Sequence, residues 1–241
     1  MNVDNFLAEN EIANFIIKNN FKFSNRLTDQ LNYPRVVSLA YFYKLHQELS
    51  FEGKIGIVSG SMNDPEVSLL ESAKYTFEIM SYEDDPRRYN LDTLWEEDER
   101  FDLVLCNQVL EHIFNPHIAF SSLKNITKKG GYIWVSIPTV NCIHGEPDFY
   151  SSGFHPRFFS RIAKQNSLEI IHIGCWGNKK YLTQCVLGRW LTYRQLKPGV
   201  HNKADLAFPY YIHQDGTRNE FDKNVNIIKR TNFKYFVSPY C

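Results

Sequence analysis

From Lys54 onward, the chain alternates short apolar runs of β type with segments of helical spacing. The runs are Ile55 to Val58, Thr76 to Tyr82, Leu103 to Cys106, Tyr132 to Ile137 and Leu168 to Ile173. This alternation is typical of a parallel sheet whose strands are joined by crossover helices. The run Leu103 to Cys106 is apolar without a polar position. It is therefore predicted to be a central strand covered on both faces.

Two helices are predicted before the first strand. Apolar residues recur at helical spacing after Pro34, which suits a first turn: Leu39, Phe42, Leu45 or His46, and Leu49. An earlier cluster of Ile12, Phe15 and Ile16 indicates the second helix. Neither segment carries evident chemistry, so we expect a helical cap over a core.

Two crossover helices have clear beginnings and ends. The first is predicted to be capped by Asn115, to start at Pro116, and to close through the sequence Lys128-Lys129-Gly130-Gly131. The second is predicted to start near Pro156 and to exit through a left-handed Asn166. Its buried residues are predicted to be Phe159, Ile162 and Ala163.

Composition and charge divide the chain into three parts. Of 241 residues, 43% are hydrophobic and 15% aromatic, which excludes fibrous and disordered classes. The expected parts are a helical cap (1–50), a core (51–175) and a basic aromatic extension (176–241). Formal net charge is zero, so there is no general attraction to nucleic acid or an anionic membrane. However, 61–100 holds twelve acids against four bases, and 176–241 holds eleven bases against four acids.

The sequence predicts a cytoplasmic protein without a metal site. No apolar run approaches the roughly 18 residues of a membrane span, and the first ten residues carry Asp4 and Glu9 where a secretory signal is basic and then apolar. Five cysteines at irregular spacing favour free thiols. The clusters Cys142-x-His144, His155 and His172-x-x-Cys175 lack the paired spacing of zinc sites.

The segment from Phe101 to Pro138 contains a sequence motif, followed in order by a predicted helix and a glycine pair. Asp102, then Val109-Leu110-Glu111-His112, then Pro116, a helix and the pair Gly130-Gly131 occur in this order. In this respect the chain resembles the class I S-adenosylmethionine-dependent methyltransferases. The resemblance implies a Rossmann-like sheet with helices on both faces, and S-adenosyl-L-methionine as cofactor.

Cofactor contacts are expected at the ends of several strands. In an open α/β sheet, ligands lie beyond the carboxyl ends of the strands where the chain order reverses, which nominates Asn107 and Gln108 after the third run. The resemblance adds Glu111, Glu83 for the ribose hydroxyls and Asp92 near the adenine. The open alternatives are a turn role for Asn107 and an exposed or capping carboxylate for Glu111. For Glu83 they are a solvated acidic turn, or Asp84 or Asp85 as the ribose contact in its place.

The loop after the first strand departs from the family pattern. Ser59, Gly60 and Ser61 are expected to let backbone approach the cofactor, but Gly60 is the only glycine of this loop and no acid precedes it. This departure motivates an alternative function, a non-catalytic binding or scaffold domain that keeps the fold.

Histidines are the candidates for catalysis. Methyl transfer is a displacement in which the protein mainly positions the reactants, and a base helps only if the acceptor is a hydroxyl or an amine. His144 and His155 in the loop after the run Tyr132 to Ile137, and His112 in the motif, are the candidate bases. Their alternatives are ordinary surface or capping roles.

The extension combines twelve aromatic residues with its eleven bases. Its aromatic residues include Trp176, Tyr181, Trp190, Tyr193, Tyr210 and Tyr211. Flat rings and cations suit a sugar, a nucleotide-linked sugar or another anionic acceptor, and also single-stranded nucleic acid. The extension could equally pack on the core or on a second subunit. We expect methylation of a small molecule or a sugar or glycan precursor, and the neutral total charge disfavours an RNA substrate.

Overall fold

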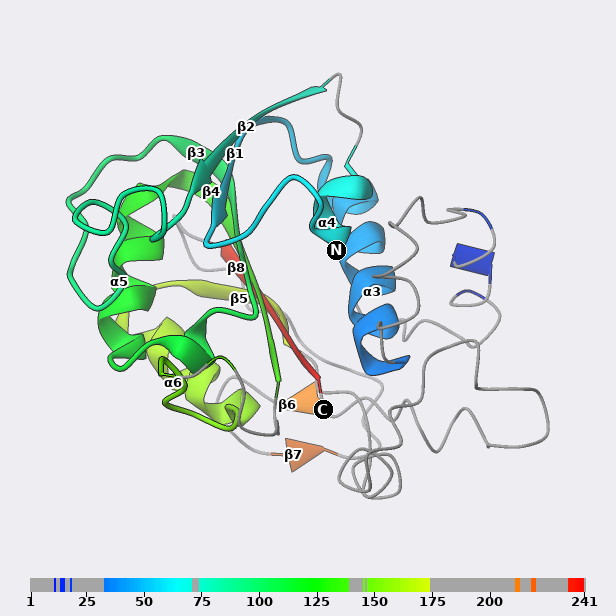
Figure 1. Cartoon of the computed structure of the whole chain (residues 1–241). Coiled ribbons are helices and arrows are strands. Elements are labelled where there is room, and N and C mark those ends of the chain that lie inside the picture. The colour runs from blue at the N-terminus through cyan, green and yellow to red at the C-terminus, as the bar shows by residue number, and fades with distance from the viewer. Residues whose placement is uncertain are drawn as a thin grey trace.

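A parallel sheet of six strands forms the centre of the computed structural model, in the order β2-β1-β3-β4-β8-β5 (Figure 1). The structure describes residues 11, 14, 15, 18, 33–70, 74–138, 145, 147–173, 211–212, 218–219 and 234–240. The strands of this sheet are β1 (Gly53–Val58), β2 (Tyr75–Met80), β3 (Phe101–Asn107), β4 (Thr127–Pro138), β5 (Glu169–Ile173) and β8 (Lys234–Tyr240). The predicted α/β class and the five predicted strands are confirmed.

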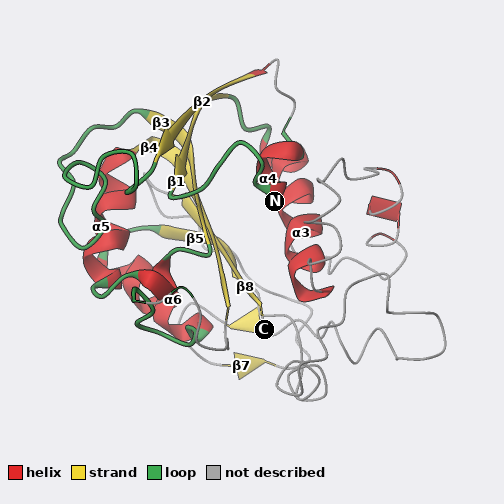
Figure 2. Ribbon diagram, viewed as in Figure 1, coloured by secondary structure: helices red, strands yellow, loops and turns green. Residues whose placement is uncertain are grey.

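Helices cover both faces of the sheet (Figure 2). On one face lie α3 (Tyr33–Leu49) and the short α4 (Pro65–Ser68). On the other lie α5 (Pro116–Ile126) and α6 (Pro156–Gln165), and a single 3-10 turn, η2 (Leu110–His112), follows β3. This is the Rossmann-like arrangement that the sequence predicts.

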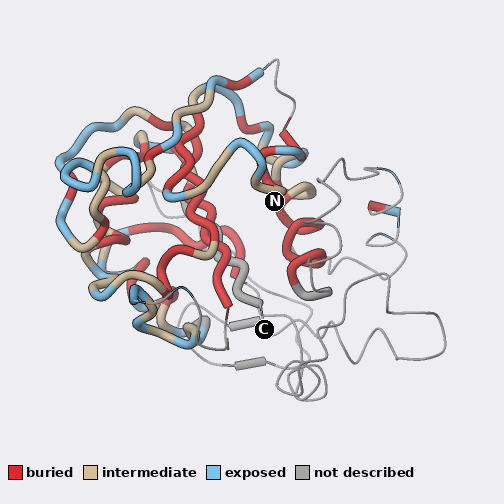
Figure 3. Tube along the Cα trace, in the orientation of Figure 1, coloured by how far each residue is buried: buried red, intermediate tan, exposed pale blue. Residues whose placement is uncertain are grey.

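The alternation of side chains along β3 produces two separate hydrophobic cores. Leu103 and Leu105 pack with α3 residues such as Phe42, whereas Val104 and Cys106 pack with the α5 and α6 side. All four β3 residues are almost completely buried, and Figure 3 shows the central strands of the sheet in the colour of buried residues. The absence of polar positions in this run therefore reflects burial on both faces.

The end of α5 differs from the prediction. Asn115 caps the helix as expected, its side chain accepting from the backbone N–H of Ile118. The helix stops at Ile126 and the next residue already belongs to β4, so Lys128 lies in the strand. Its Nζ lies 2.9 Å from Oδ2 of Asp102. The cation therefore pairs with a carboxylate on the neighbouring strand and not with the helix dipole.

The end of α6 also differs by one residue. Asn166 has φ of −92°, so it is not the left-handed residue. Ser167 has φ of +55° and makes the left-handed turn into β5. The buried residues of α6 are as predicted, with Phe159, Ile162 and Ala163 inaccessible.

Strand β8 comes from the part of the chain to which the sequence assigned no structure. It pairs in parallel with β4 on one side and β5 on the other. A two-stranded antiparallel ladder joins β6 (Tyr211–Ile212) and β7 (Arg218–Asn219). The other aromatic residues named above, Trp176, Tyr181, Trp190, Tyr193 and Tyr210, lie outside the described residues.

No helix among the described residues is long and apolar enough to cross a bilayer. Cys106 is a free, buried thiol, and burial raises its pKa. The predicted helix around Phe15 is described at residues 11, 14, 15 and 18, each of them helical. Phe15 is buried and packs 5.4 Å from the Tyr43 ring, centroid to centroid.

Candidate functional site

The strand order reverses between β1 and β3, which lie side by side. Val58 at the end of β1 is the register partner of Cys106 near the end of β3. The residues that follow each strand, Ser59 and Gln108, both have positive φ, at 49° and 57°. Left-handed backbone is uncommon outside glycine and is concentrated at functional sites. The residues that follow β1 and β3 are thus adjacent at one edge of the sheet.

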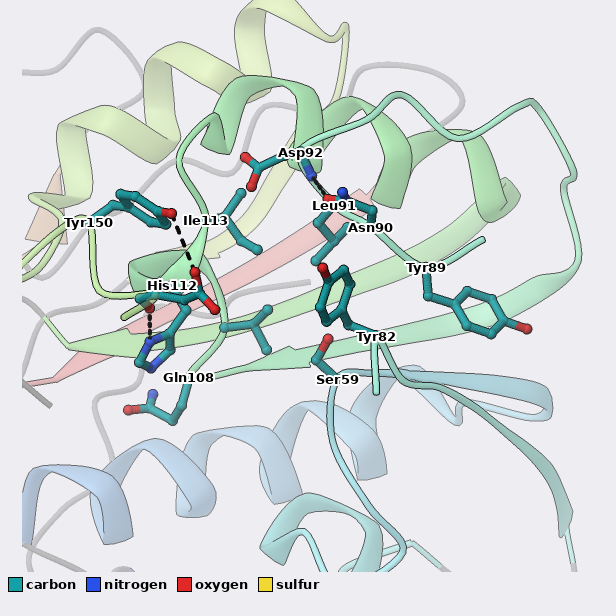
Figure 4. A pocket seen from close by; sticks show the side chains of 12 residues that line it. Ser59, Tyr82, Tyr89, Asn90, Leu91, Asp92, Gln108, His112, Ile113 and Tyr150 are labelled. Atoms are coloured by element: carbon teal, nitrogen blue, oxygen red, sulfur yellow. Dashed lines mark hydrogen bonds between the residues drawn. The ribbon is translucent and has the colours of Figure 1, made fainter. Parts of the chain in front are cut away.

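A cavity of about 390 Å³ opens at this edge. Its lining residues are Ser59, Tyr82, Tyr89, Asn90, Leu91, Asp92, Gln108, Val109, His112, Ile113, Asp148 and Tyr150. Figure 4 shows Ser59 and Tyr82 on one side of it, His112 and Tyr150 on the other, and the segment of Asn90 and Asp92 above. Its volume lies in the range of small-molecule pockets.

Hydrogen bonds from backbone N–H groups to side-chain oxygens fix the Asn90–Asp92 wall of the cavity. The Asp92 carboxylate accepts from the backbone N–H of Asn115 at 2.7 Å, and the Asn90 side chain accepts from the N–H of Asp92 at 2.8 Å. The loop between β2 and β3 is therefore fastened to the start of α5. Leu91 behind it is buried and gives this wall an apolar surface.

Two polar side chains near the end of β3 are buried without hydrogen-bond partners. Asn107 is 9% exposed and Glu111 is 0% exposed. Both amide atoms of Asn107 and both carboxylate oxygens of Glu111 lack a partner. Burial raises the pKa of Glu111 to about 7, although the nearby N–H of its own backbone and the Arg35 charge both lower it. Unsatisfied buried groups of this kind are rare and call for an explanation such as an absent ligand.

Arg35 of α3 brings a buried positive charge to the same place. Its Nη2 donates to Oε2 of Glu66 at 2.6 Å, and its Nη1 donates to Oγ of Ser136 at 2.6 Å. Ser136 is the register partner of Asn107, and its carbonyl oxygen accepts from the backbone N–H of Gln108 at 2.7 Å. We call Arg35, Glu66, Asn107, Glu111 and Ser136 the buried polar cluster.

The cavity and the buried polar cluster contain most of the residues predicted around β3. Gln108, His112 and Asp92 line the cavity, together with Ser59 from the β1 end. Asn107 and Glu111 belong to the buried polar cluster. The alternative of an exposed Glu111 is wrong, because the side chain is inaccessible.

The residues predicted on the β1 and β2 side lie differently. Gly60 and Ser61 do not line this cavity. Asp64 folds back over them: it accepts from the backbone N–H of Ser61 at 3.0 Å, and a Cβ on Gly60 would lie 2.4 Å from its Oδ2. Glu83 is exposed and also outside the lining. Their assignment to the cofactor stays a prediction.

The three candidate bases have different positions. His112 lines the cavity, with Nδ1 2.6 Å from the carbonyl oxygen of Asp148. His155 caps α6, its Nδ1 accepting from the N–H of Arg157 at 3.1 Å, and does not line this cavity. His144 lies outside the described residues, as do Cys142 and Cys175. Among the residues described, no group of three acidic, histidine or cysteine side chains could hold a metal ion.

The sequence analysis did not identify Arg35 of the buried polar cluster, nor three tyrosines that line the cavity. Tyr89 and Tyr150 sit in irregular loops, where no periodicity marks them. The sequence pattern places Tyr82 at the end of a strand, but it does not mark the residue as a ligand contact. Arg35 had a usable signal. It stands four residues before Leu39 and seven before Phe42, which puts a charge on the apolar stripe of the helix.

Comparisons with known proteins agree with this geometry. Residues 53–186 match the family model described as a methyltransferase domain. A ubiquinone biosynthesis O-methyltransferase of Glaesserella parasuis serovar 5 (strain SH0165) is 44% identical over 43 residues, which cover 18% of this chain and 17% of the relative. The enzyme of the same name from Stutzerimonas stutzeri (strain A1501) is 25% identical over 130 residues, covering 48% of this chain and 51% of the relative. No solved structure matches significantly.

Proposed function

Because the chain belongs to the methyltransferase-domain family, we propose that it transfers a methyl group from S-adenosyl-L-methionine to a hydroxyl or amine of a small molecule or sugar-containing precursor. The matched relatives are named as O-methyltransferases, which favours a hydroxyl acceptor. The matched stretches reach only 17% and 51% of their lengths, so the acceptor of those enzymes is not transferred to this chain.

The cavity suits the adenosine part of the cofactor. Leu91, Val109 and Ile113 supply apolar surface for a flat base, and Asn90 and Asp92 supply polar atoms at its edge. A mostly apolar pocket with a few fixed polar groups is the usual design of a small-molecule site. The lining of the cavity is thus of the kind that would suit an adenosine group.

The buried polar cluster suits the charged methionine end. A ligand that carries both an ammonium and a carboxylate would supply donors to Asn107 and Glu111 and an anion to Arg35. Burying these polar side chains unpaired costs on the order of 1–3 kcal/mol each, and a ligand that pairs them recovers this cost. The unpartnered Asn107 and Glu111 side chains are the observation that carries the proposal.

The cofactor supplies an electrophilic methyl group on a sulfonium, and the protein's part is mainly to position the acceptor and to exclude water. The buried end of β3 provides a dry environment, since Asn107 and Glu111 are both inaccessible or nearly so. Glu111, with a pKa of about 7, is able to hold a proton or to release it near neutral pH.

A non-catalytic binding domain is the second candidate. Asp64 occupies the space over Gly60, and Glu83 lies outside the cavity, so the β1 and β2 side offers fewer groups to a ligand. This observation favours a protein that keeps the fold without turnover.

Calorimetric titration with S-adenosylmethionine and S-adenosylhomocysteine tests the proposal. We expect heat of binding for both ligands. Absence of heat for both, at millimolar ligand and with folded protein, would leave the non-catalytic domain. Binding of both without methyl transfer to a panel of hydroxyl and amine acceptors would favour a binding module.

A further inference from the structure

His112 connects the turn after β3 to the segment after β4. Its Nδ1 lies 2.6 Å from the backbone carbonyl oxygen of Asp148. A carbonyl oxygen only accepts, so Nδ1 must carry the hydrogen in this contact. The imidazole therefore donates to the backbone of a segment 36 residues further along the chain.

Further contacts join the same two segments. The carbonyl oxygen of Glu111 accepts from the backbone N–H of Tyr150 at 2.9 Å and of Ser151 at 3.1 Å. Gly145 has φ of +66°, and a Cβ there would lie 2.8 Å from Cε1 of His112. The Phe149 ring meets the imidazole edge to face at 5.8 Å between centroids. Gly145 and residues 147–151 thus pack on the η2 turn.

This segment supplies one wall of the cavity. Asp148 and Tyr150 both line it, opposite Ser59 and Tyr82 (Figure 4). Tyr150 is 50% exposed and packs against the exposed Phe114 at 5.4 Å between ring centroids. Among the described residues, neither Asp148 nor Tyr150 belongs to the two hydrophobic cores. The hydrogen bonds to His112 and to the Glu111 carbonyl oxygen are the described polar contacts that hold this wall.

We infer that His112 is a positioning residue: its Nδ1–H holds the 147–151 segment so that Asp148 and Tyr150 form the outer wall of the cofactor cavity. This inference rests on the proposed function in one respect, that the cavity receives the adenosine of the cofactor. It differs from a role as general base, which the sequence left open for His112, because a base needs the imidazole itself to exchange a proton.

Three substitutions of His112 separate the two roles. In Asn, Nδ2 is two bonds from Cβ like Nδ1 of His, so His112→Asn keeps a donor for the Asp148 carbonyl. His112→Gln moves the amide one bond further out, and His112→Ala removes the donor. His117→Ala is the matched control, since His117 is an exposed histidine on α5 that contacts the Phe158 ring and does not line the cavity.

Two measurements show the effect of these substitutions, and neither requires the methyl acceptor to be known. The first is the S-adenosylhomocysteine dissociation constant by calorimetry, and the second is amide hydrogen exchange of the peptide that contains Tyr150 and Ser151, measured without ligand. A neutral hydrogen bond contributes about 0.5–1.5 kcal/mol, so we expect His112→Ala and His112→Gln to weaken binding and to speed exchange about 3- to 10-fold. His112→Asn and His117→Ala should match the wild type in both.

The outcomes distinguish this inference from the proposed function. Exchange at Tyr150 and Ser151 that is the same in wild type and His112→Ala would overturn the inference, and so would binding in His112→Asn as weak as in His112→Ala. A wild type that binds no S-adenosylhomocysteine would overturn the proposed function and the cofactor part of the inference. The exchange comparison would still decide whether His112 seats the segment.

Discussion

The two halves of the carboxyl edge of the sheet satisfy their polar groups in different ways. After β1, the carboxylate of Asp64 accepts from Ser61, and after β2 Glu83 faces solvent. After β3, Asn107 and Glu111 are buried and have no partner. In the β1 and β2 half, these polar side chains have partners in the protein or face solvent without a ligand. In the β3 half, the two buried side chains have no partner.

This difference locates the source of ligand affinity. A group already bonded to protein or water gains little when a ligand replaces that partner, whereas an unsatisfied buried group gains the whole hydrogen bond. Recognition of the cofactor should therefore depend more on the β3 and β4 half than on the acids after β2. Four substitutions test this comparison, here in order of decreasing effect.

Arg35→Ala should have the largest effect, a loss of about 3–5 kcal/mol in the free energy of unfolding, because it leaves Glu66 buried without its cation. Urea denaturation measures it. Arg35→Met combined with Glu66→Leu removes both charges and should recover most of the loss. If Arg35→Ala unfolds at the wild-type urea concentration, the ion pair is not buried in solution.

Glu111→Gln should change the dependence of stability on pH. The pKa of Glu111 in the folded protein is about 7, above the ordinary 4.5, so the folded state holds its proton more tightly than the unfolded state. This group therefore makes the wild type less stable as pH rises from about 4.5 to 7, by on the order of 3 kcal/mol. In Glu111→Gln, this pH-dependent loss of stability should be absent.

Denaturation at pH 4, 6 and 8 measures the pH effect. Wild type and Glu111→Gln should differ least at pH 4, with the variant gaining in relative stability towards pH 8. A constant difference across this range would mean that Glu111 titrates with an ordinary pKa.

Asn107→Leu should separate binding from stability. Leucine has a similar shape and no polar atoms, so stability should be kept or increased, while S-adenosylhomocysteine binding weakens about tenfold or more. The matched control is Asn125→Leu, because the Asn125 amide donates to the Trp95 carbonyl at 2.8 Å. That variant should lose about 1 kcal/mol of stability without a change in affinity. Equal affinity in Asn107→Leu and wild type would remove Asn107 from the site.

Glu83→Ala should have the smallest effect, a change in S-adenosylhomocysteine affinity below about threefold, because an exposed carboxylate keeps its hydration in the free protein. Asp84→Ala, in the same exposed turn, is the control. A tenfold loss specific to Glu83→Ala would support the ribose contact expected from the family resemblance and would place affinity on both halves of the edge.

Local patterns were enough to predict the fold around β3. The apolar run at Leu103 and the cap at Asn115 depend on neighbouring residues only, and both match the structure. Strand β8 was not predicted, since its place is set by pairing with β4 and β5 far away in sequence. The end of α5 was misassigned because Lys128 finds a carboxylate on another strand, which its local sequence does not reveal.

The site was predictable where it follows a strand end. Asn107 and Gln108 follow from the rule that ligands lie beyond the carboxyl ends of the strands. The burial of Asn107, the charge of Arg35 beside it and the wall formed by Tyr150 arise from tertiary contacts between α3, β4 and the segment after β4. A motif gives the type of side chain at a position, but the hydrogen-bond partners depend on the complete fold.

The position of β8 has a consequence for how the protein is made. The ribosome synthesises β4 and β5 well before residues 234–240, yet the sheet joins these two strands only through β8. In a nascent chain that ends at residue 173, one edge of β4 and both edges of β5 are therefore unpaired, and unpaired strand edges are prone to association with other chains. Strand β8 can pair with β4 and β5 only after about 60 more residues have been translated. This protein should therefore depend on chaperones during synthesis more than a domain whose strands pair in the order in which they are made.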